Sequence, residues 1–373
     1  MREVPFIYSD NLLKYLLSPS HPFNPKRWKI VYQMYKFTTE AYPDLPTKLV
    51  EPRIAKREEI ELVHDPAYVS FVEEKSRQGF GFLDYGDTPV SFTLYEGARY
   101  SYGGSLTAVD LIKEGASIVV SIGGGLHHAR RDRAAGFCVF NDVAGAAKYA
   151  QKLGFKKVAI VDIDAHHGDG TQYILGSDPT TLKISFHESG RYLYPGTGFP
   201  DEIGIGDGKG FTINFPYLPS ATDSDFILAF DKIVPTALRE FKPDLILVQS
   251  GVDSHKRDPL THVQFSNNVH IHAASQLIDL AKNLSGGRIA FLGGGGYNYE
   301  VVSRTWVYFL ALASDFEMEK VPKDWAGYIS NFGFVANETY RDKQPQPTKI
   351  ARAHIETLKE LKENVPLLSE MEI

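Results

Sequence analysis

The pattern of apolar runs along the chain restricts its fold more than any other sequence feature. Short runs of β-branched and aliphatic residues recur between longer stretches whose apolar residues follow helical spacing. We expect strands at about 5–10, 116–122, 156–164, 181–187, 211–215, 244–250 and 288–293, and helices at about 25–42, 66–78, 96–114, 141–153, 224–241, 267–284 and from about 298 to 313. Strands that alternate with helices form a parallel sheet through right-handed crossovers. The sequence therefore predicts an α/β fold, a single-domain parallel sheet flanked by helices.

The composition is typical of a soluble globular protein. The 373 residues are 43% hydrophobic and 23% charged, and the formal net charge of −6 argues against nonspecific binding to nucleic acid. The N-terminus shows no apolar core of a secretory signal, and the longest apolar run, near 306–313, is too short to span a bilayer. The single cysteine, Cys138, excludes an internal disulfide framework. We expect a cytoplasmic protein without a nucleic-acid or membrane partner.

Reactive side chains follow four of the predicted strands. In VDIDAHHGDG (161–170), Asp162, Asp164 and His166 alternate, so they point to one side if the chain stays extended. The other strand ends are followed by His127 and His128, by Asp253 and by Tyr297. Ligands of open α/β sheets bind outside the carboxyl ends of the strands. We therefore expect the active site at the edge of the sheet where these ends meet.

These residue types suit metal-assisted hydrolysis. Buried unpaired charge is costly, whereas Asp164, His166 and Asp253 would together bind zinc or ferrous iron and leave a position open for water and substrate. Such a metal lowers the pKa of water and polarises a substrate carbonyl. The remaining residues are candidates for supporting roles. His127 and His128 are suited to acid–base chemistry, and Asp162 and Asp169 could accept hydrogen bonds from site histidines. Tyr297 could donate a hydrogen bond to an oxyanion. The residues alone thus indicate a hydrolase of an amide or similar carbonyl.

Other histidines and the cysteine have simpler explanations. His270 and His272 lie two positions apart in a predicted helix and do not share a face, so we expect surface or core roles for them. His167 points away from His166 in an extended chain, and we expect it to pack structurally. Cys138 has no activating neighbours in the sequence, so we expect a buried thiol rather than a nucleophile.

The motifs together closely resemble the zinc-dependent histone deacetylase family, which includes acetoin-utilisation proteins and deacetylase-like amidohydrolases and shares its fold with arginase. The resemblance covers about residues 5–315 and rests on GGGLHHA, GFCVFND, VDIDAHHGDG, YPGTG, GVD and GGGGY. It implies removal of an acetyl or other acyl group from the side-chain amine of lysine, through attack of a zinc-bound water. We expect a catalytic domain at 1–320 and a C-terminal extension at 321–373 with a terminal helix at about 348–363.

The resemblance also implies roles for individual residues. Zinc would be bound by Asp164, His166 and Asp253. His128 would be the general base and acid, His127 its electrostatic partner, and Tyr297 the group that polarises the acyl carbonyl, while Asp162 and Asp169 would hold the two histidines. The substrate would contact Gly136, Phe137, Leu193, Tyr194 and Leu260 in a tunnel with Asp87 at its rim, and Arg27 would serve acetate release. Structural potassium (K+) would bind through Asp162, Asp164, His166, Ser185 and Phe186.

The substrate class stays open at this point. Polyamine deacetylases that resemble this chain carry a glutamate at the position of Leu260, so the leucine favours acyl-lysine in a protein or peptide over a small acylated amine such as an acetylpolyamine. Arg257 stands where glycine is frequent, and it would alter the rim. An inactive acyl-lysine binder is a third alternative, opposed by the complete catalytic set. A binuclear ureohydrolase is more remote, because no second aspartate set follows Asp253.

Overall fold

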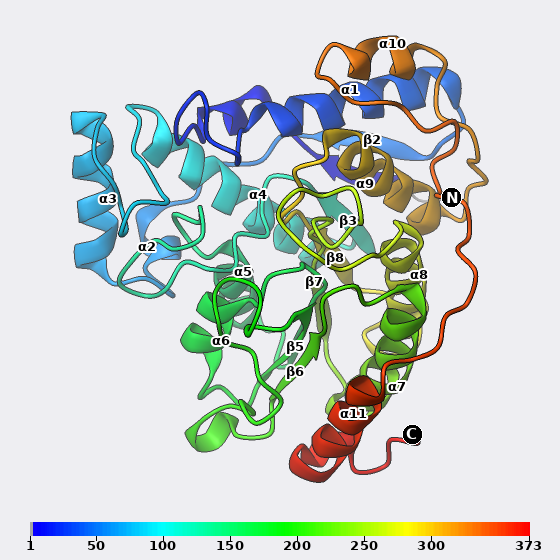
Figure 1. Ribbon diagram of the computed structural model, residues 1–373. Helices are drawn as coiled ribbons and strands as arrows, with labels where there is room; N and C mark the ends of the chain where they lie inside the picture. Colours follow the sequence, from blue (N-terminus) through cyan, green and yellow to red (C-terminus); the bar gives the residue numbers. More distant parts are fainter. Residues whose placement is uncertain (1–2) are drawn as a thin grey trace.

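An eight-stranded parallel sheet forms the centre of the molecule. The computed structural model describes residues 3–373 (Figure 1). The strands are β1 (Val4–Ile7), β2 (Thr47–Val50), β3 (Ile118–Ser121), β4 (Val158–Asp162), β5 (Thr181–Glu188), β6 (Thr212–Tyr217), β7 (Leu245–Gln249) and β8 (Ile289–Leu292). They follow the order β2-β1-β3-β8-β7-β4-β5-β6, and every neighbouring pair is parallel. The predicted fold class is therefore confirmed.

Helices cover both faces of this sheet. They are α1 (Lys26–Ala41), α2 (Arg57–Ile60), α3 (Pro66–Gln78), α4 (Leu94–Lys113), α5 (Asp142–Lys152), α6 (Asp169–Leu175), α7 (Asp223–Phe241), α8 (Asn268–Leu284), α9 (Tyr299–Ser314), α10 (Asp324–Ser330) and α11 (Arg352–Asn364), with short 3₁₀ turns at Asp10–Lys14, Gly206–Gly208 and Pro366–Leu368. Helices α4 and α5 lie on one side of the sheet, and α7 and α8 cover the other (Figure 1). Strands β4, β5, β7 and β8 are buried along their whole length, as expected for a parallel sheet covered on both faces.

The strand order brings distant parts of the chain together. β8 and β7 lie between β3 and β4, although both come more than 80 residues after β4 in the sequence. The loops that follow β3, β8, β7 and β4 are therefore neighbours at the carboxyl edge of the sheet. These are the four loops that carry the reactive residues of the sequence.

The predicted elements match the structure to within a few residues, and the differences have local causes. The first strand ends at Ile7 and is followed by a 3₁₀ turn, where we expected it to continue to residue 10. The terminal helix begins at Arg352 rather than at 348, and the segment before it is tied to α7, where Thr348 N donates to Ser224 Oγ (3.0 Å). The sequence did not indicate the half-exposed edge strand β2 or the short helices α2, α6 and α10, which are too short to show a clear period.

The segment 321–373 packs against the main body of the protein. Helix α10 lies beside α1, and α11 lies beside α7 and β6 (Figure 1). Apolar side chains of this segment are buried in the main core: Trp325, Ile329, Tyr340, Leu358, Leu361, Val365, Leu368 and Met371. Within residues 3–373, no helix combines the length and the apolar character needed to cross a bilayer.

Candidate metal centre and active-site pocket

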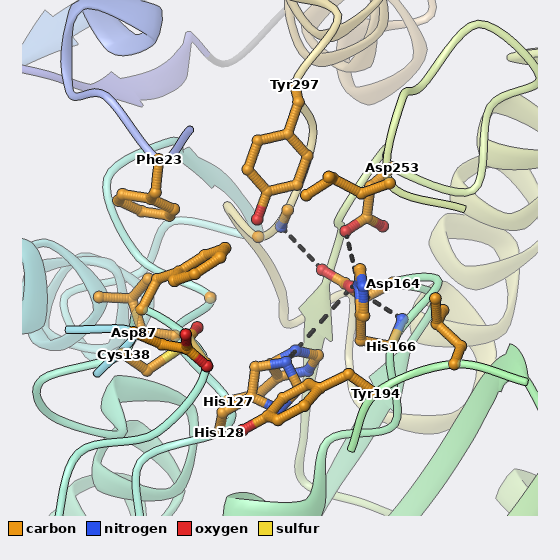
Figure 2. Close-up of a pocket in the computed structure, with 18 residues that line it drawn as sticks. Phe23, Asp87, His127, His128, Cys138, Asp164, His166, Tyr194, Asp253 and Tyr297 are labelled. Carbon is orange, nitrogen blue, oxygen red and sulfur yellow. Dashed lines mark hydrogen bonds and ion pairs between the residues drawn. The ribbon is translucent and has the colours of Figure 1, made fainter. Parts of the chain in front are cut away.

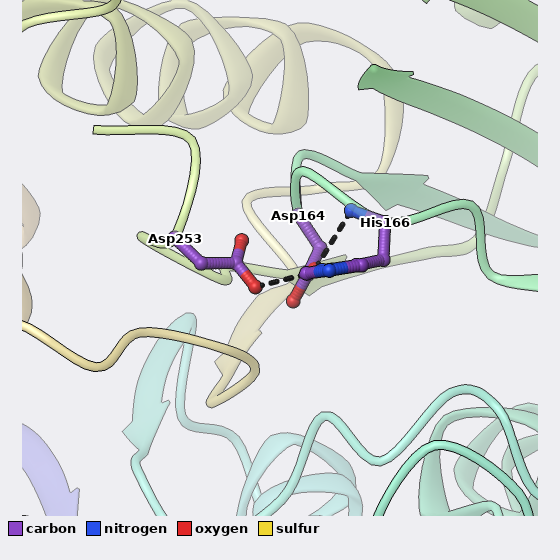
Figure 3. Close-up of side chains that lie close together, drawn as sticks. All are labelled: Asp164, His166 and Asp253. Atoms are coloured by element: carbon purple, nitrogen blue, oxygen red, sulfur yellow. Dashed lines mark hydrogen bonds and ion pairs between the residues drawn. The ribbon is translucent and has the colours of Figure 1, made fainter. Parts of the chain in front are cut away.

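Three buried side chains converge at the carboxyl ends of β4 and β7 (Figure 3). His166 Nδ1 lies 3.2 Å from Asp164 Oδ1 and 3.0 Å from Asp253 Oδ2. One potential ligand atom from each residue lies within 4.8 Å of the other two. Two carboxylates and an imidazole nitrogen are a suitable donor set for a divalent transition metal. The structure thus brings the predicted triad together.

The surroundings of the triad also fit a bound cation. Gly295 N and Gln249 Nε2 donate to Asp164 Oδ2 (2.7 and 2.8 Å), and Ala165 N donates to Asp253 Oδ1 (2.8 Å). Each carboxylate is therefore held by one oxygen while the other faces His166. Burial raises the pKa of Asp253, and the adjacent Asp164 carboxylate raises it further. Two buried carboxylates that share one imidazole are costly unless a cation joins them, which supports a metal at this position.

Asp162 lies behind this triad and has another partner. Its Oδ2 accepts a hydrogen bond from His127 Nδ1 (2.7 Å), and its Oδ1 accepts one from Asp164 N (3.1 Å). β4 ends at Asp162, so the condition that the chain stays extended through residue 166 is not met. The alternating side chains consequently divide between two sites rather than forming one.

His127 and His128 form a pair beside the triad (Figure 2). His128 Nδ1 donates to Asp169 Oδ1 (2.8 Å), at the first turn of α6, while His127 Nδ1 donates to Asp162. The two Nε2 atoms lie 3.1 Å apart. Because each ring is held from behind by a carboxylate, both Nε2 atoms are directed towards the same region of the pocket.

The two rings differ in their affinity for a proton. Burial opposes charge on His127, but the carboxylates of Asp162 and Asp164 outweigh it and raise its pKa to about 9. Burial, together with the neighbouring charge of His127, lowers the pKa of His128 to about 4. These opposite pKa shifts favour a charged His127, whose Nε2–H can donate to the unprotonated Nε2 of His128.

A cavity of about 280 Å³ leads from the surface to the triad and the histidine pair (Figure 2). Its wall includes all of the predicted substrate-contacting residues: Asp87, Gly136, Phe137, Leu193, Tyr194 and Leu260. Gly136 leaves room for this wall, because a Cβ at its position would lie 2.5 Å from the His128 ring. The structure therefore places the predicted tunnel directly over the candidate metal centre.

Tyr297 lies on the opposite side of the cavity from the histidine pair, and its hydroxyl is directed into the cavity (Figure 2). Burial raises the pKa of this phenol well above its usual range, so the hydroxyl remains a donor. Asp258 holds the loop in place: its Oδ2 accepts from Tyr297 N (2.8 Å) and its Oδ1 from Leu260 N (3.0 Å). One buried carboxylate thus fixes both Tyr297 and the leucine in the tunnel wall.

Two charged residues that the sequence associates with the rim have different surroundings, and only Asp87 lines the cavity. Asp87 sits in a loop organised by Asp84, whose Oδ1 accepts from the backbone N–H groups of Gly86, Asp87 and Thr88 (2.9–3.0 Å). The carboxylate of Asp87 has no hydrogen-bond partner within residues 3–373 and is exposed. Arg257, by contrast, is paired with the buried Glu300 (2.6 Å). Asp87 is therefore the charged group that is available to a substrate.

Arg27 is fully buried below the pocket, and its guanidinium group is only partly satisfied. Nη1 donates to Gly296 O (3.2 Å), next to Tyr297, while Nε and Nη2 have no partner within residues 3–373. The ring of Phe23 lies 4.1 Å from the guanidinium carbon. Buried unpaired donors are costly, so this group is suited to a small anion.

The residues expected to bind potassium lie in β4, in the loop that follows it and in β5, and their side chains have protein partners. Asp162 and Ser185 are paired in the register of β4 and β5. Ser185 Oγ lies 2.8 Å from His187 Nδ1, and the ring of Phe186 packs against Phe230 at 5.4 Å between centroids. The potassium assignment remains a prediction.

The side chains for which we expected no catalytic role have ordinary partners. His167 Nδ1 lies 2.8 Å from Thr197 Oγ1, and His270 Nε2 lies 3.0 Å from Ser254 Oγ. His272 pairs with Asp231 on the neighbouring helix (2.6 Å). Cys138 is buried in the cavity wall, and burial raises the pKa of its thiol well above the usual range.

Sequence reasoning missed several residues that shape the site. Phe23 and Leu126 line the cavity, and Asp84 and Asp258 organise its rim and wall. Phe23 lies at least 64 residues from the other wall residues, so no local pattern indicated it. Asp258 lies two residues before Leu260, and no feature of the sequence distinguishes it from an ordinary loop aspartate.

Comparison with known proteins agrees with this geometry. The histone deacetylase domain model matches residues 21–313. The chain is 37% identical to the acetoin utilization protein AcuC of Bacillus subtilis (strain 168) over 338 residues, which cover 87% of this chain and 86% of that protein. It is 35% identical to AcuC of Staphylococcus aureus (strain MRSA252), with 88% of this chain and 91% of that protein covered.

Solved structures share the whole fold. An HDAC homolog complexed with SAHA matches with a TM-score of 0.86 and 27% identity, and the match covers 97% of this chain and 100% of that chain. An HDAC homolog from Aquifex aeolicus matches with a TM-score of 0.85 and the same identity and coverage.

The parallel sheet and the site at its carboxyl edge thus define a hydrolase with the arginase and deacetylase fold. The chain belongs to the histone deacetylase family and is a deacetylase, and membership implies a divalent metal and an acetylated amine substrate.

Proposed function

We propose that this deacetylase removes acyl groups from lysine side chains in proteins or peptides, with zinc as its metal. The observation that carries the proposal is the cavity itself, a passage with apolar walls that ends at the Asp164, His166 and Asp253 triad. Phe137, Leu193, Tyr194 and Leu260 would contact the methylene chain of lysine. At the mouth, the free carboxylate of Asp87 would accept hydrogen bonds from the substrate backbone.

The donor set of the triad fits zinc, which would polarise the acyl carbonyl and lower the pKa of the attacking water when bound. His128 Nε2 would take a proton from that water and return it to the leaving amine, because its Nδ1 is fixed by Asp169. His127, held in its charged form by Asp162, would offset negative charge that develops nearby. Tyr297 would donate its hydroxyl proton in a hydrogen bond to the developing oxyanion.

The same proposal assigns supporting roles outside the cavity. Arg27, with its two unpaired nitrogens, would bind the carboxylate product on its way out. Potassium would bind near Asp162 and Ser185 and stabilise the loop that carries the triad. Residues 1–320 would form the catalytic domain, and 321–373 would be an extension that stabilises it by packing on its core.

A deacetylase of small acylated amines is the second candidate, and the free carboxylate of Asp87 favours it as well, because a second ammonium group could pair with it. The test compares acetate release by zinc-loaded protein from an acetyl-lysine peptide and from acetylputrescine. Higher kcat/KM for the peptide supports the leading proposal. Higher kcat/KM for acetylputrescine moves the function to small-molecule metabolism, and release from neither substrate contradicts both.

A further inference from the structure

A buried cation outside the active-site pocket has no role in the chemistry above. Lys183, the third residue of β5, is only 5% exposed. Its Nζ donates to the backbone carbonyl oxygens of Leu175 (2.9 Å), Thr181 (2.9 Å) and Asp178 (3.4 Å). No carboxylate oxygen within residues 3–373 lies closer than 4.0 Å to Nζ, and the side chain of Asp178 is paired with Lys148 instead (2.6 Å). Within residues 3–373, backbone carbonyl oxygens therefore accept every hydrogen bond that this amine donates. Burial lowers the pKa of Lys183 to about 7, and the nearby Asp178 carboxylate opposes that shift.

Such an arrangement is the environment that a dissolved monovalent cation would select. Proteins that bind K+ replace its hydration shell with backbone carbonyl oxygens. The segment 175–181 bends around Nζ, since Asp178 N donates to Leu175 O (3.0 Å) and Thr181 N donates to Asp178 O (3.4 Å). Without a cation, the three carbonyls would direct their negative ends at one another in a buried space, which is unfavourable.

The position of the carbonyls connects Lys183 to the catalytic histidines. Leu175 is the last residue of α6, and the negative end of a helix favours a cation. Asp169, the first residue of the same helix, accepts the hydrogen bond from His128. A helix of seven residues is not stable without external contacts. Lys183 thus fixes one end of α6 while the other end orients His128.

We propose that the Lys183 ammonium is a built-in monovalent cation for the 175–181 carbonyl loop, and that it positions His128 through α6. The tethered ammonium makes this loop independent of dissolved cations. If the side chain is shortened, the space that remains should accept K+ or free ammonium, whose sizes are similar, and should accept the larger choline poorly.

The test uses Lys183→Ala in the zinc-loaded protein, purified in KCl and then transferred to choline chloride, NaCl, KCl or NH4Cl at equal ionic strength. We expect the unfolding midpoint of Lys183→Ala to be higher in KCl or NH4Cl than in choline chloride. This difference between salts should be about 3–5 °C larger in the variant than in the wild type. We also expect kcat to recover saturably with K+ or ammonium. Subtracting the wild-type response removes any effect of the potassium site proposed near Asp162.

Two further variants distinguish the effect of the positive charge from the effect of filling the space. Lys183→Met fills the same space without charge, so it should lose stability in every salt without a cation-specific recovery. Lys148→Ala removes a nearby cation that pairs with the Asp178 carboxylate, and it should show no preference for K+ over choline beyond that of the wild type. The proposal is overturned if Lys183→Ala behaves like Lys183→Met in all four salts. It is also overturned if Lys183→Ala is as stable in choline chloride as the wild type, or does not fold even in KCl.

Discussion

The Nε2 atoms of His127 and His128 lie 3.1 Å apart, although the two rings are anchored on different elements of the fold. Asp162, the last residue of β4, holds His127, whereas Asp169, the first residue of α6, holds His128. The pair therefore depends on the relative position of a strand end and a helix start. Because each carboxylate acts on one ring, substitutions at the two carboxylates should separate the roles of the rings.

Asp169→Asn should lower kcat by about 10–100-fold with little change in KM, because Asp169 orients His128 without lining the cavity. His128→Ala should lower kcat further, by about 10²–10⁴-fold, because it removes the proton acceptor itself. Acetate release from an acetyl-lysine peptide measures both. Arg130→Met is a matched control, because Arg130 pairs with the other Asp169 oxygen (3.0 Å) and leaves the His128 bond intact. A rise in KM at unchanged kcat would contradict the assigned role.

Tyr297→Phe should reduce kcat by about 10²–10³-fold and leave substrate affinity nearly unchanged. The substitution removes only the hydroxyl that is directed into the cavity, while Asp258 continues to hold the backbone of the loop. Single-turnover acetate release gives the chemical step, and calorimetric titration with an acetyl-lysine peptide gives the affinity. If affinity and kcat fell together, the tyrosine would be a binding residue instead.

Removal of the divalent metal should abolish activity and lower thermal stability. The Asp164 and Asp253 carboxylates would then lie buried beside each other without a cation, a costly arrangement. Treatment with a chelator followed by Zn2+ or Fe2+ should restore turnover, and the relative recovery identifies the preferred metal. Asp253→Asn should bind less than stoichiometric zinc by elemental analysis. One zinc per chain in this variant would show that Asp253 is not a ligand.

Leu260→Glu should shift the substrate preference from peptide towards acetylputrescine. The leucine lines the tunnel and its N–H is held by Asp258, so a glutamate there would place a carboxylate where the free ammonium of a polyamine could pair with it. The ratio of the two kcat/KM values should change by about tenfold or more. Leu260→Gln is the control for size, and it should change the ratio much less. An equal shift in both variants would exclude charge as the cause.

Local sequence patterns predict which reactive side chains follow the strand ends, but they do not predict which other residues surround them in space. Asp164, His166, Asp253, the histidine pair and Tyr297 each follow an apolar strand, and this local signal was sufficient to find them. That the four loops are adjacent depends on β7 and β8 lying between β3 and β4, which no local pattern encodes. Phe23 and Lys183 were missed for a related reason, because their roles arise from segments that meet only in the folded chain.

The stability of the protein should rise between pH 4 and pH 6.5 partly because of His64. This side chain is buried, and its Nε2 accepts from the backbone N–H of Asn141 (2.8 Å), whose side chain in turn donates to His127 O (3.0 Å). Burial lowers the pKa of His64 to about 4 in the folded state, whereas an unfolded histidine titrates near 6.5. Between these values the unfolded chain binds more protons than the folded chain, so lowering the pH favours unfolding.

The contribution of His64 to this pH dependence should reach about 3 kcal/mol, the product of the pKa difference and the energy of one pKa unit. His64→Gln retains an acceptor for Asn141 N and removes the titrating group, so its free energy of unfolding should change less between pH 7 and pH 4.5. Urea unfolding of wild type and variant at both pH values measures the difference. Acid loss of a bound metal affects both proteins equally and cancels in the comparison. Parallel pH profiles for the two proteins would mean that the pKa of His64 in the folded state is not lowered, which would contradict this prediction.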